Sequence, residues 1–276
     1  MEDKNITFLI SSLSGGGSEA LCVNLANSFA ELGWKVNLVV LNMKNSVYHE
    51  RLSNNVNFTT LDVRHALYSP YKLIKYLLVK KPKKILVFTY ELTSIIVLIK
   101  KLLGLDLKII ARNRNTMSHV QKRPGGFWIR YIVNPFVKKF YGYADHIINQ
   151  CEGMRNDLLT IYPEIIQKTS TIYNPINSVI NEYAKTIDFK NVKSQEYILC
   201  VGRLERQKAF HFAIEGFARL TKEFPSLRLK ILGVGTLEDE LKECACNLGI
   251  RKKVDFEGLY KQKFTKLQEQ KALSDK

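Results

Sequence analysis

The 276-residue sequence has few cysteines, no long apolar run and no complete dinucleotide-binding fingerprint. Its five cysteines are an odd number and include no Cys-x-x-Cys pair, which argues against a disulfide framework and against a thiolate zinc site. No apolar run reaches the roughly 20 residues of a membrane helix. The N-terminus carries two acids and leads directly into a strand-like segment, so we expect neither a signal peptide nor a transit peptide. These absences predict a cytoplasmic protein with reduced cysteines.

Acidic residues are scarce in one third of the chain. Residues 64–143 contain 17 Lys or Arg but only two acids, Glu91 and Asp106, and therefore hold +15 of the net charge of +16. The same segment contains twelve aromatic residues. Basic side chains beside aromatic and aliphatic ones suit the surface of an anionic membrane. We therefore predict that residues 64–143 bind the inner face of the plasma membrane peripherally.

Two other functions fit parts of this pattern. A basic patch could bind nucleic acid, but no recognised DNA- or RNA-binding motif accompanies the charge. An NAD-dependent enzyme would need a complete GxGxxG and an acid about 20 residues beyond it, and the glycine turn at 14–19 lacks that spacing. We expect no nucleic acid as a partner.

Apolar periodicity in the first half alternates between the period of a strand and that of a helix. Strands are expected at 5–11, 35–41, 56–61, 85–90, 108–111, 144–149 and 168–173, with helices between several of them. Residues 125–143 resemble one amphipathic helical region interrupted at Asn134-Pro135. This alternation predicts an α/β domain with a parallel sheet over residues 1–177.

The apolar periodicity of the first half stops in a polar stretch and then resumes. Residues 178–195 are interpreted as a linker, and 196–276 as a second domain with strands at 197–201, 227–232 and 254–256 and helices at 210–224 and 237–248. The fold class is therefore α/β with two Rossmann-like domains.

A basic loop follows the first strand of this second domain. Gly202 ends the strand, and Arg203 and Lys208 stand just ahead of a helix. Helix N-termini and fixed cations both stabilise phosphate groups. Spacing alone leaves two readings open, a diphosphate site and a solvated surface loop.

Polar residues also follow a strand of the first domain. Arg112, Asn113 and Asn115 leave the carboxyl end of the strand at 108–111, where open α/β sheets bind their ligands. They could bind a sugar or phosphate, or they could cap the next helix.

Five separated motifs, taken in order, resemble glycosyltransferase family 4 and the GT-B fold. They are SSLSGGGSEALCVNLANSFAELGWKV at 11–36, YADHIINQCEGMRNDL at 143–158, TIYNPIN at 171–177, YILCVGRLERQKAFHFAIEGFARL at 197–220 and LKILGVGTLEDELKECACNLGIRKKVDFEGL at 229–259.

The resemblance implies a retaining transfer of a sugar from a nucleotide sugar, with UDP expected as the nucleotide, to a lipid-linked or polysaccharide acceptor in cell-surface polysaccharide biosynthesis. It implies neither a metal nor a cofactor. The expected catalytic residues, which neutralise the leaving diphosphate, are Arg203 and Lys208. The expected donor-binding residues are Gly16, Gly17, Gly202, Gly233, Gly235, Gly258 and Leu259. The expected acceptor- or sugar-binding residues are Arg112, Asn113, Asn115 and Asn174.

The sequence departs from the family pattern in its last part. The family continues past the strand at 254–256 into a Glu-x7-Glu segment that holds the donor sugar and ribose. Glu215 and Glu223 have that spacing, but they lie on the helix after the phosphate loop and are interpreted as surface acids. The second domain is therefore expected to be incomplete through truncation, with weak or absent transferase activity in this chain.

Overall fold

The computed structural model describes residues 4–14, 16–44, 46–63, 69–112, 115–118, 126–176, 178–187 and 197–258. The chain forms two compact units, Met1–Pro175 (unit 1) and Ile176–Lys276 (unit 2). Unit 1 contains a seven-stranded sheet and unit 2 a three-stranded one, and every strand pair is parallel. This confirms the predicted α/β class, and the second sheet is the smaller one in the part of the chain that is described.

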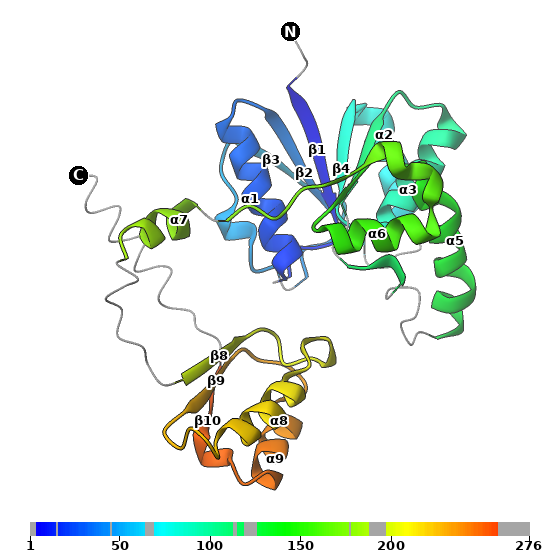
Figure 1. Cartoon of the computed structure of the whole chain (residues 1–276). Coiled ribbons are helices and arrows are strands. Elements are labelled where there is room, and N and C mark those ends of the chain that lie inside the picture. The colour runs from blue at the N-terminus through cyan, green and yellow to red at the C-terminus, as the bar shows by residue number, and fades with distance from the viewer. Residues whose placement is uncertain are drawn as a thin grey trace, which may run out of the picture. The chain divides into compact units, whose positions relative to one another are not determined.

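The unit 1 sheet has the strand order β3-β2-β1-β4-β5-β6-β7, and its first four strands are labelled in Figure 1. Its strands are β1 (Asn5–Ile10), β2 (Lys35–Val40), β3 (Val56–Thr60), β4 (Lys84–Val87), β5 (Lys108–Arg112), β6 (His146–Asn149) and β7 (Thr169–Thr171). The longer helices are α1 (Gly17–Glu31), α2 (Ser69–Lys80), α3 (Tyr90–Leu103), α5 (Asn134–Phe140) and α6 (Glu152–Ile161). Because all strands are parallel, their carboxyl ends lie along one edge, which we call the carboxyl edge.

Alternation along the strands divides the core of unit 1 between the two faces of the sheet. Phe8 and Ile10 of β1 pack in a cluster with Cys22 of α1. Leu9, between them in sequence, belongs to a second cluster with residues such as Leu73 of α2, Ile96 of α3 and Leu158 of α6. Successive side chains of a strand point to opposite faces. Helix α1 therefore covers one face, and α2, α3 and α6 cover the other.

The helical region before β6 is continuous, so the predicted interruption at Asn134-Pro135 is wrong. A π-helical segment, Ile129–Val133, passes directly into α5, and Val133 and Asn134 both have right-handed helical backbones. A proline inside a helix clashes with the carbonyl four residues earlier. The wider π turn just ahead of Pro135 is one way in which a helix continues past such a residue.

Unit 2 contains β8 (Tyr197–Val201), α8 (Phe210–Leu220), β9 (Arg228–Leu232), α9 (Glu238–Asn247) and β10 (Val254–Gly258), in the sheet order β10-β9-β8. One core cluster joins Ile231 of β9 to Ile214 of α8 and Leu241 of α9. Leu199 and Val201 of β8 lie on the opposite face and are exposed.

Unit 2 also includes a helix within the stretch expected to be a linker. Helix α7 spans Ser178–Lys185, so the first part of this segment is not irregular. Its apolar residues Val179, Ile180 and Tyr183 are spaced one and three residues apart, which is a short helical pattern that the sequence analysis overlooked.

Candidate functional site

The basic loop of unit 2 is anchored by one buried leucine. Leu204 is fully buried, its N–H donates to the carbonyl of Val234 at 3.0 Å, and its own carbonyl accepts from the N–H of Leu237 at 3.1 Å. These two bonds tie the loop after β8 to the loop after β9. The backbone that carries the basic side chains is therefore held in place at Leu204.

Two glycines of the loop after β9 allow these two loops to approach each other. Gly233 has a φ of 149°, and a Cβ there would lie 1.8 Å from the carbonyl oxygen of Gly202. A Cβ at Gly235 would lie 2.3 Å from the carbonyl oxygen of Leu204. Gly233 also donates its N–H to the carbonyl of Gly258 at 2.9 Å. The fold therefore requires glycine at 233 and 235, and their predicted contact with the donor stays a prediction.

Arg203 and Lys208 are both exposed on this loop. Neither side chain forms an ion pair with any residue in the described ranges. The aliphatic part of Lys208 lies over Gly202, with Cδ and Cε 3.5 Å from the position that a Cβ would occupy there. Ala209, with a left-handed φ of 51°, is the N-cap of α8. Two uncompensated cations beside a helix N-terminus provide favourable electrostatics for a diphosphate.

A buried arginine lies at the carboxyl edge of unit 1. Arg112 ends β5 and is only 6% exposed. Its Nη2 donates a hydrogen bond to Oδ1 of Asn174, whose Nδ2 donates to Oε1 of Gln150 at 3.4 Å. Nη1 of Arg112 is buried and has no hydrogen-bond partner among the residues that the structure describes. Burial lowers the pKa of this guanidinium. The structure thus brings together Arg112 and Asn174, which the sequence analysis named separately.

The sequence also predicts two acceptor- or sugar-binding residues just after β5, Asn113 and Asn115. The backbone carbonyl of Asn115 accepts a hydrogen bond from the hydroxyl of Tyr90, so this loop is held against α3. Asn113, and the donor residue Leu259 of unit 2, lie outside the described residues. The sequence analysis missed Gln150, although its position directly after the strand β6 was a usable signal.

A buried acidic side chain of α1 lies next to the glycine turn that precedes this helix. Gly16 caps the helix, and a Cβ there would lie 2.3 Å from Oε2 of Glu19, which is buried. The Cβ position of Gly17 has open space around it, apart from neighbouring backbone, as far as the described residues show. The carboxylate of Glu19 therefore lies against Gly16, at the N-terminus of α1. The predicted donor contact of Gly16 and Gly17 stays a prediction.

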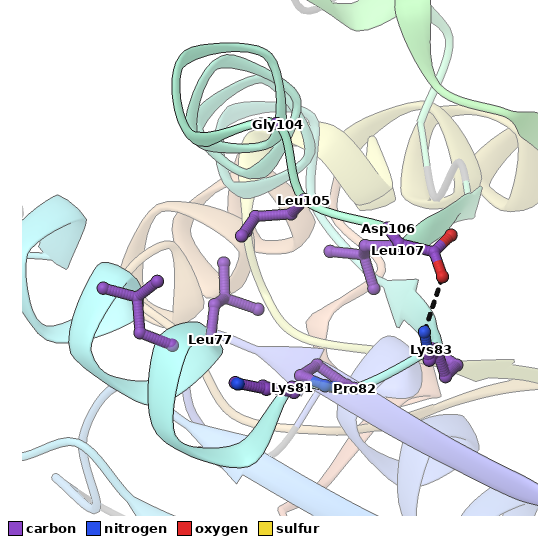
Figure 2. A pocket seen from close by; sticks show the side chains of 9 residues that line it. Leu77, Lys81, Pro82, Lys83, Gly104, Leu105, Asp106 and Leu107 are labelled. Carbon is purple, nitrogen blue, oxygen red and sulfur yellow. Dashed lines mark hydrogen bonds and ion pairs between the residues drawn. The ribbon is translucent and has the colours of Figure 1, made fainter.

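The cavity in Figure 2 lies at the opposite edge of the unit 1 sheet. It has a volume of about 190 Å³ and lies between the ends of α2 and α3, lined by residues such as Leu77, Lys81 and Leu105. Lys83 and Asp106 form an ion pair of 2.5 Å at its rim (Figure 2). Ligands of parallel sheets bind at the carboxyl ends of strands. This cavity is therefore not the candidate site.

The described part of the chain contains no group of three or more His, Cys, Asp or Glu residues that could hold a metal ion. No helix in it is both long and apolar enough to cross a bilayer.

Comparison with known proteins identifies the family. The model described as "Glycosyltransferase Family 4" matches residues 15–179, which is more than half of the chain. The chain belongs to glycosyltransferase family 4. The model described as "Glycosyl transferases group 1" matches residues 184–269. Members of these families are enzymes, and the predicted family membership is confirmed.

Relatives of this family match at moderate identity. An uncharacterized glycosyltransferase of Methanocaldococcus jannaschii is 27% identical over 205 residues, which is 70% of this chain and 50% of the relative. The N-acetylgalactosamine-N,N'-diacetylbacillosaminyl-diphospho-undecaprenol 4-alpha-N-acetylgalactosaminyltransferase of Campylobacter jejuni is 26% identical over 275 residues, covering 91% of this chain and 68% of that protein. The chain thus spans about half of the archaeal relative and about two thirds of the Campylobacter one.

Solved structures of other glycosyltransferases share the fold of this chain. The lipopolysaccharide outer core galactosyltransferase WaaB, without ligand, has a TM-score of 0.66 at 18% identity, covering 96% of this chain and 70% of WaaB. Anabaena HepE in complex with UDP and glucose has a TM-score of 0.66 at 16% identity, covering 93% of this chain and 69% of HepE. These likenesses confirm the predicted GT-B fold.

Proposed function

We propose that this protein transfers a sugar from a nucleotide sugar, with UDP as the nucleotide, to a lipid-linked or polysaccharide acceptor, and that the transfer retains the anomeric configuration. The proposed pathway is cell-surface polysaccharide biosynthesis. The observation that carries the donor part is the pair of exposed cations Arg203 and Lys208, which form no ion pair within the described ranges and lie on an anchored loop ahead of α8.

The proposed chemistry uses charge on the leaving group. The bond between the anomeric carbon and the β-phosphate oxygen breaks, and the acceptor hydroxyl oxygen forms the new bond to that carbon. The hydroxyl proton passes to the departing phosphate oxygen. Arg203 and Lys208 stabilise the negative charge that develops on the diphosphate, which is where preorganised cations lower a barrier most. With these groups in place the proposal includes no metal and no other cofactor.

Unit 1 is proposed to bind the acceptor or the transferred sugar through Arg112 and Asn174, with Asn113 and Asn115 nearby in sequence. A buried guanidinium nitrogen without a partner favours a ligand oxygen there, because an unsatisfied buried donor costs free energy. The name of the Campylobacter relative describes a diphospho-undecaprenol substrate, which supports a lipid-linked acceptor. A lipid-linked acceptor also fits the proposed peripheral docking of residues 64–143 on the cytoplasmic face of the membrane.

Calorimetry with nucleoside diphosphates and their matching monophosphates tests the donor site. For one base, the diphosphate should bind more tightly than the monophosphate. Arg203→Ala and Lys208→Ala should each weaken diphosphate binding by about 10-fold or more, since a charge-assisted hydrogen bond contributes roughly 1.5–3 kcal/mol. Monophosphate affinity should change little.

Arg206→Ala is the matched control, because Arg206 is an exposed cation of the same loop. It should leave diphosphate affinity nearly unchanged. Equal losses at all three cations would mean nonspecific attraction, and diphosphates that bind no better than monophosphates would refute the donor site. Sugar transfer from a labelled nucleotide sugar then tests whether this chain is active.

A further inference from the structure

An exposed apolar helix end stands out on unit 1. Five of the six residues at 127–132 have large apolar side chains that are between 43% and 75% exposed: Phe127, Trp128, Ile129, Tyr131 and Ile132. We call these five residues the apolar tip. Large apolar side chains normally leave water on folding, so such a concentration indicates an interaction surface.

Apolar side chains surround the whole axis of this helix end. Five of six consecutive residues cannot lie on one face of any helix, because successive side chains point in different directions around the axis. Only further along does the helix pack on its own unit, through the buried side chain of Val137. A groove on a partner protein receives one helix face, whereas a bilayer can surround a helix end on all sides.

The charges around the apolar tip select an anionic surface. Arg130 lies within the tip, and Lys138 and Lys139 are exposed in the turns that follow. The guanidinium carbon of Arg130 is 5.6 Å from the ring centroid of Tyr131. Residues 126–143 include no acid. Tryptophan and tyrosine beside basic residues are favoured where lipid headgroups meet the hydrocarbon.

The apolar tip lies on the side of unit 1 where the candidate site lies. Helix α5 leads into the amino end of β6, so its first residues are at the carboxyl edge, as Arg112 is. In Figure 1 the green helix that contains α5 extends past the edge at which the arrow of β1 ends. By contrast, Lys80, Lys81 and Lys83 precede β4 and lie at the opposite edge.

We propose that the apolar tip inserts into the headgroup region of an anionic bilayer and turns the carboxyl edge of unit 1 toward the membrane. This proposal depends on the function proposed above at one point, which is that the acceptor is lipid-linked. Insertion of the tip presents Arg112 to an acceptor whose lipid stays in the bilayer. Residues 127–132, rather than the lysines at 80–84, are then the part of segment 64–143 that enters the membrane.

The fluorescence of Trp128 tests insertion directly. The chain has two tryptophans, and Trp34→Phe leaves Trp128 alone. With vesicles of phosphatidylglycerol and phosphatidylcholine, its emission should shift to shorter wavelength and be quenched by brominated acyl chains. Binding should persist above 0.5 M salt, where attraction between exposed charges is largely screened. An unshifted, unquenched Trp128 would overturn the proposal.

Vesicle flotation of matched variants completes the test. The triple variant Phe127→Ser, Ile129→Ser, Ile132→Ser should bind vesicles at least 10-fold more weakly and keep the thermal melt of the parent. The control Val79→Ser, Leu102→Ser removes two comparably exposed residues at the opposite edge and should float normally. Equal flotation of the triple variant and the parent would overturn the proposal.

Two further readouts separate the alternatives. If light scattering shows that the triple variant dissociates a dimer while vesicle binding is unchanged, the tip is a self-association surface and the proposal is wrong. Nucleoside diphosphate affinity should be the same in the parent and the triple variant. Insertion without diphosphate binding would refute the proposed donor site and leave the inference about the tip standing.

Discussion

Arg112, at the end of β5, donates the hydrogen bond from its Nη2 to Oδ1 of Asn174, which follows β7 and lies 62 positions later in the chain. The bond spans the end of β6, the strand between them in the sheet. Asn174 is exposed, whereas the guanidinium is buried with Nη1 unsatisfied. A cation held in this way is expensive for folding, and a ligand oxygen would relieve the cost.

Replacing this arginine should therefore weaken ligand binding without destabilising the fold. We expect Arg112→Met to weaken binding of the acceptor or sugar proposed for this site by about 10-fold or more. The free energy of unfolding of unit 1 should stay level or rise by about 1 kcal/mol. Asn174 can bond to water instead. Urea unfolding followed by tryptophan fluorescence measures this, because both tryptophans lie in unit 1. A loss of stability above about 2 kcal/mol would mean that Arg112 is structural.

Two glycines of unit 2 should respond oppositely to alanine. Gly216→Ala, in α8 with open space around its Cβ position, should stabilise unit 2 by about 0.5–1 kcal/mol. Gly233→Ala should destabilise it by about 3 kcal/mol or more, because the new Cβ would overlap the carbonyl of Gly202. Thermal melts by circular dichroism measure both changes, and unchanged tryptophan fluorescence shows that unit 1 is intact. A neutral Gly233→Ala would contradict the close approach of the two loops.

Acid should weaken unit 2 through one ion pair between neighbouring strands. Arg228 of β9 donates from Nε and Nη2 to the carboxylate of Asp255 of β10, at 2.9 and 2.5 Å. The hydrogen bond from Arg228 lowers the pKa of Asp255. The contribution of this ion pair to stability is therefore fully present above about pH 3.9, the pKa of Asp in the unfolded chain. It is lost as the pH falls through the lower pKa that Asp255 has in the folded protein.

Asp255→Asn should accordingly flatten the fall in unit 2 stability below about pH 4. Melting temperatures taken by circular dichroism from pH 7 to pH 2.5 measure the effect. Glu257→Gln removes an exposed acid of the same strand and serves as the control. Parallel profiles for the parent and Asp255→Asn would contradict the role of this pair.

The cysteines should differ strongly in their rate of alkylation. Cys22 is fully buried in the core of unit 1, and burial, followed by the charge of Glu19, raises the pKa of its thiol. Cys246 is exposed on α9. Since the thiolate is the reactive form, Cys246 should react with iodoacetamide in the native protein, and Cys22 only when unit 1 unfolds. Mass spectrometry of the labelled peptides measures both rates, and early labelling of Cys22 would mean that unit 1 opens locally.

Local patterns predicted most of the fold because they report burial directly. The alternation of Lys35–Val40 and the helical spacing of Leu21, Leu25 and Phe29 arise from faces that pack against the core, although Leu32, the next apolar position of that helix, is exposed. The short pattern of α7 was missed because its apolar residues occupy little more than one turn, where a helix and a polar linker look alike.

The contacts of the candidate site were harder to predict because they join distant segments. Arg112 and Asn174 were each named from their own surroundings, and only the strand order of the sheet brings them together. The requirement for glycine at 233 likewise depends on Gly202, which belongs to the neighbouring strand connection. The exposure of the apolar tip could not be inferred from its composition, since the same residues at 127–132 could equally have lined a core.

Three hydrophobic clusters were found among the described residues, and none has members on both sides of the boundary between Pro175 and Ile176. An exchange of coding sequence at this boundary would leave each of these clusters whole. Natural recombination could then join an inherited unit 1 to a unit 2 from another gene without repacking either interior. Under the proposed assignment, such hybrids would combine the Arg112 site of one protein with the donor-diphosphate loop of another.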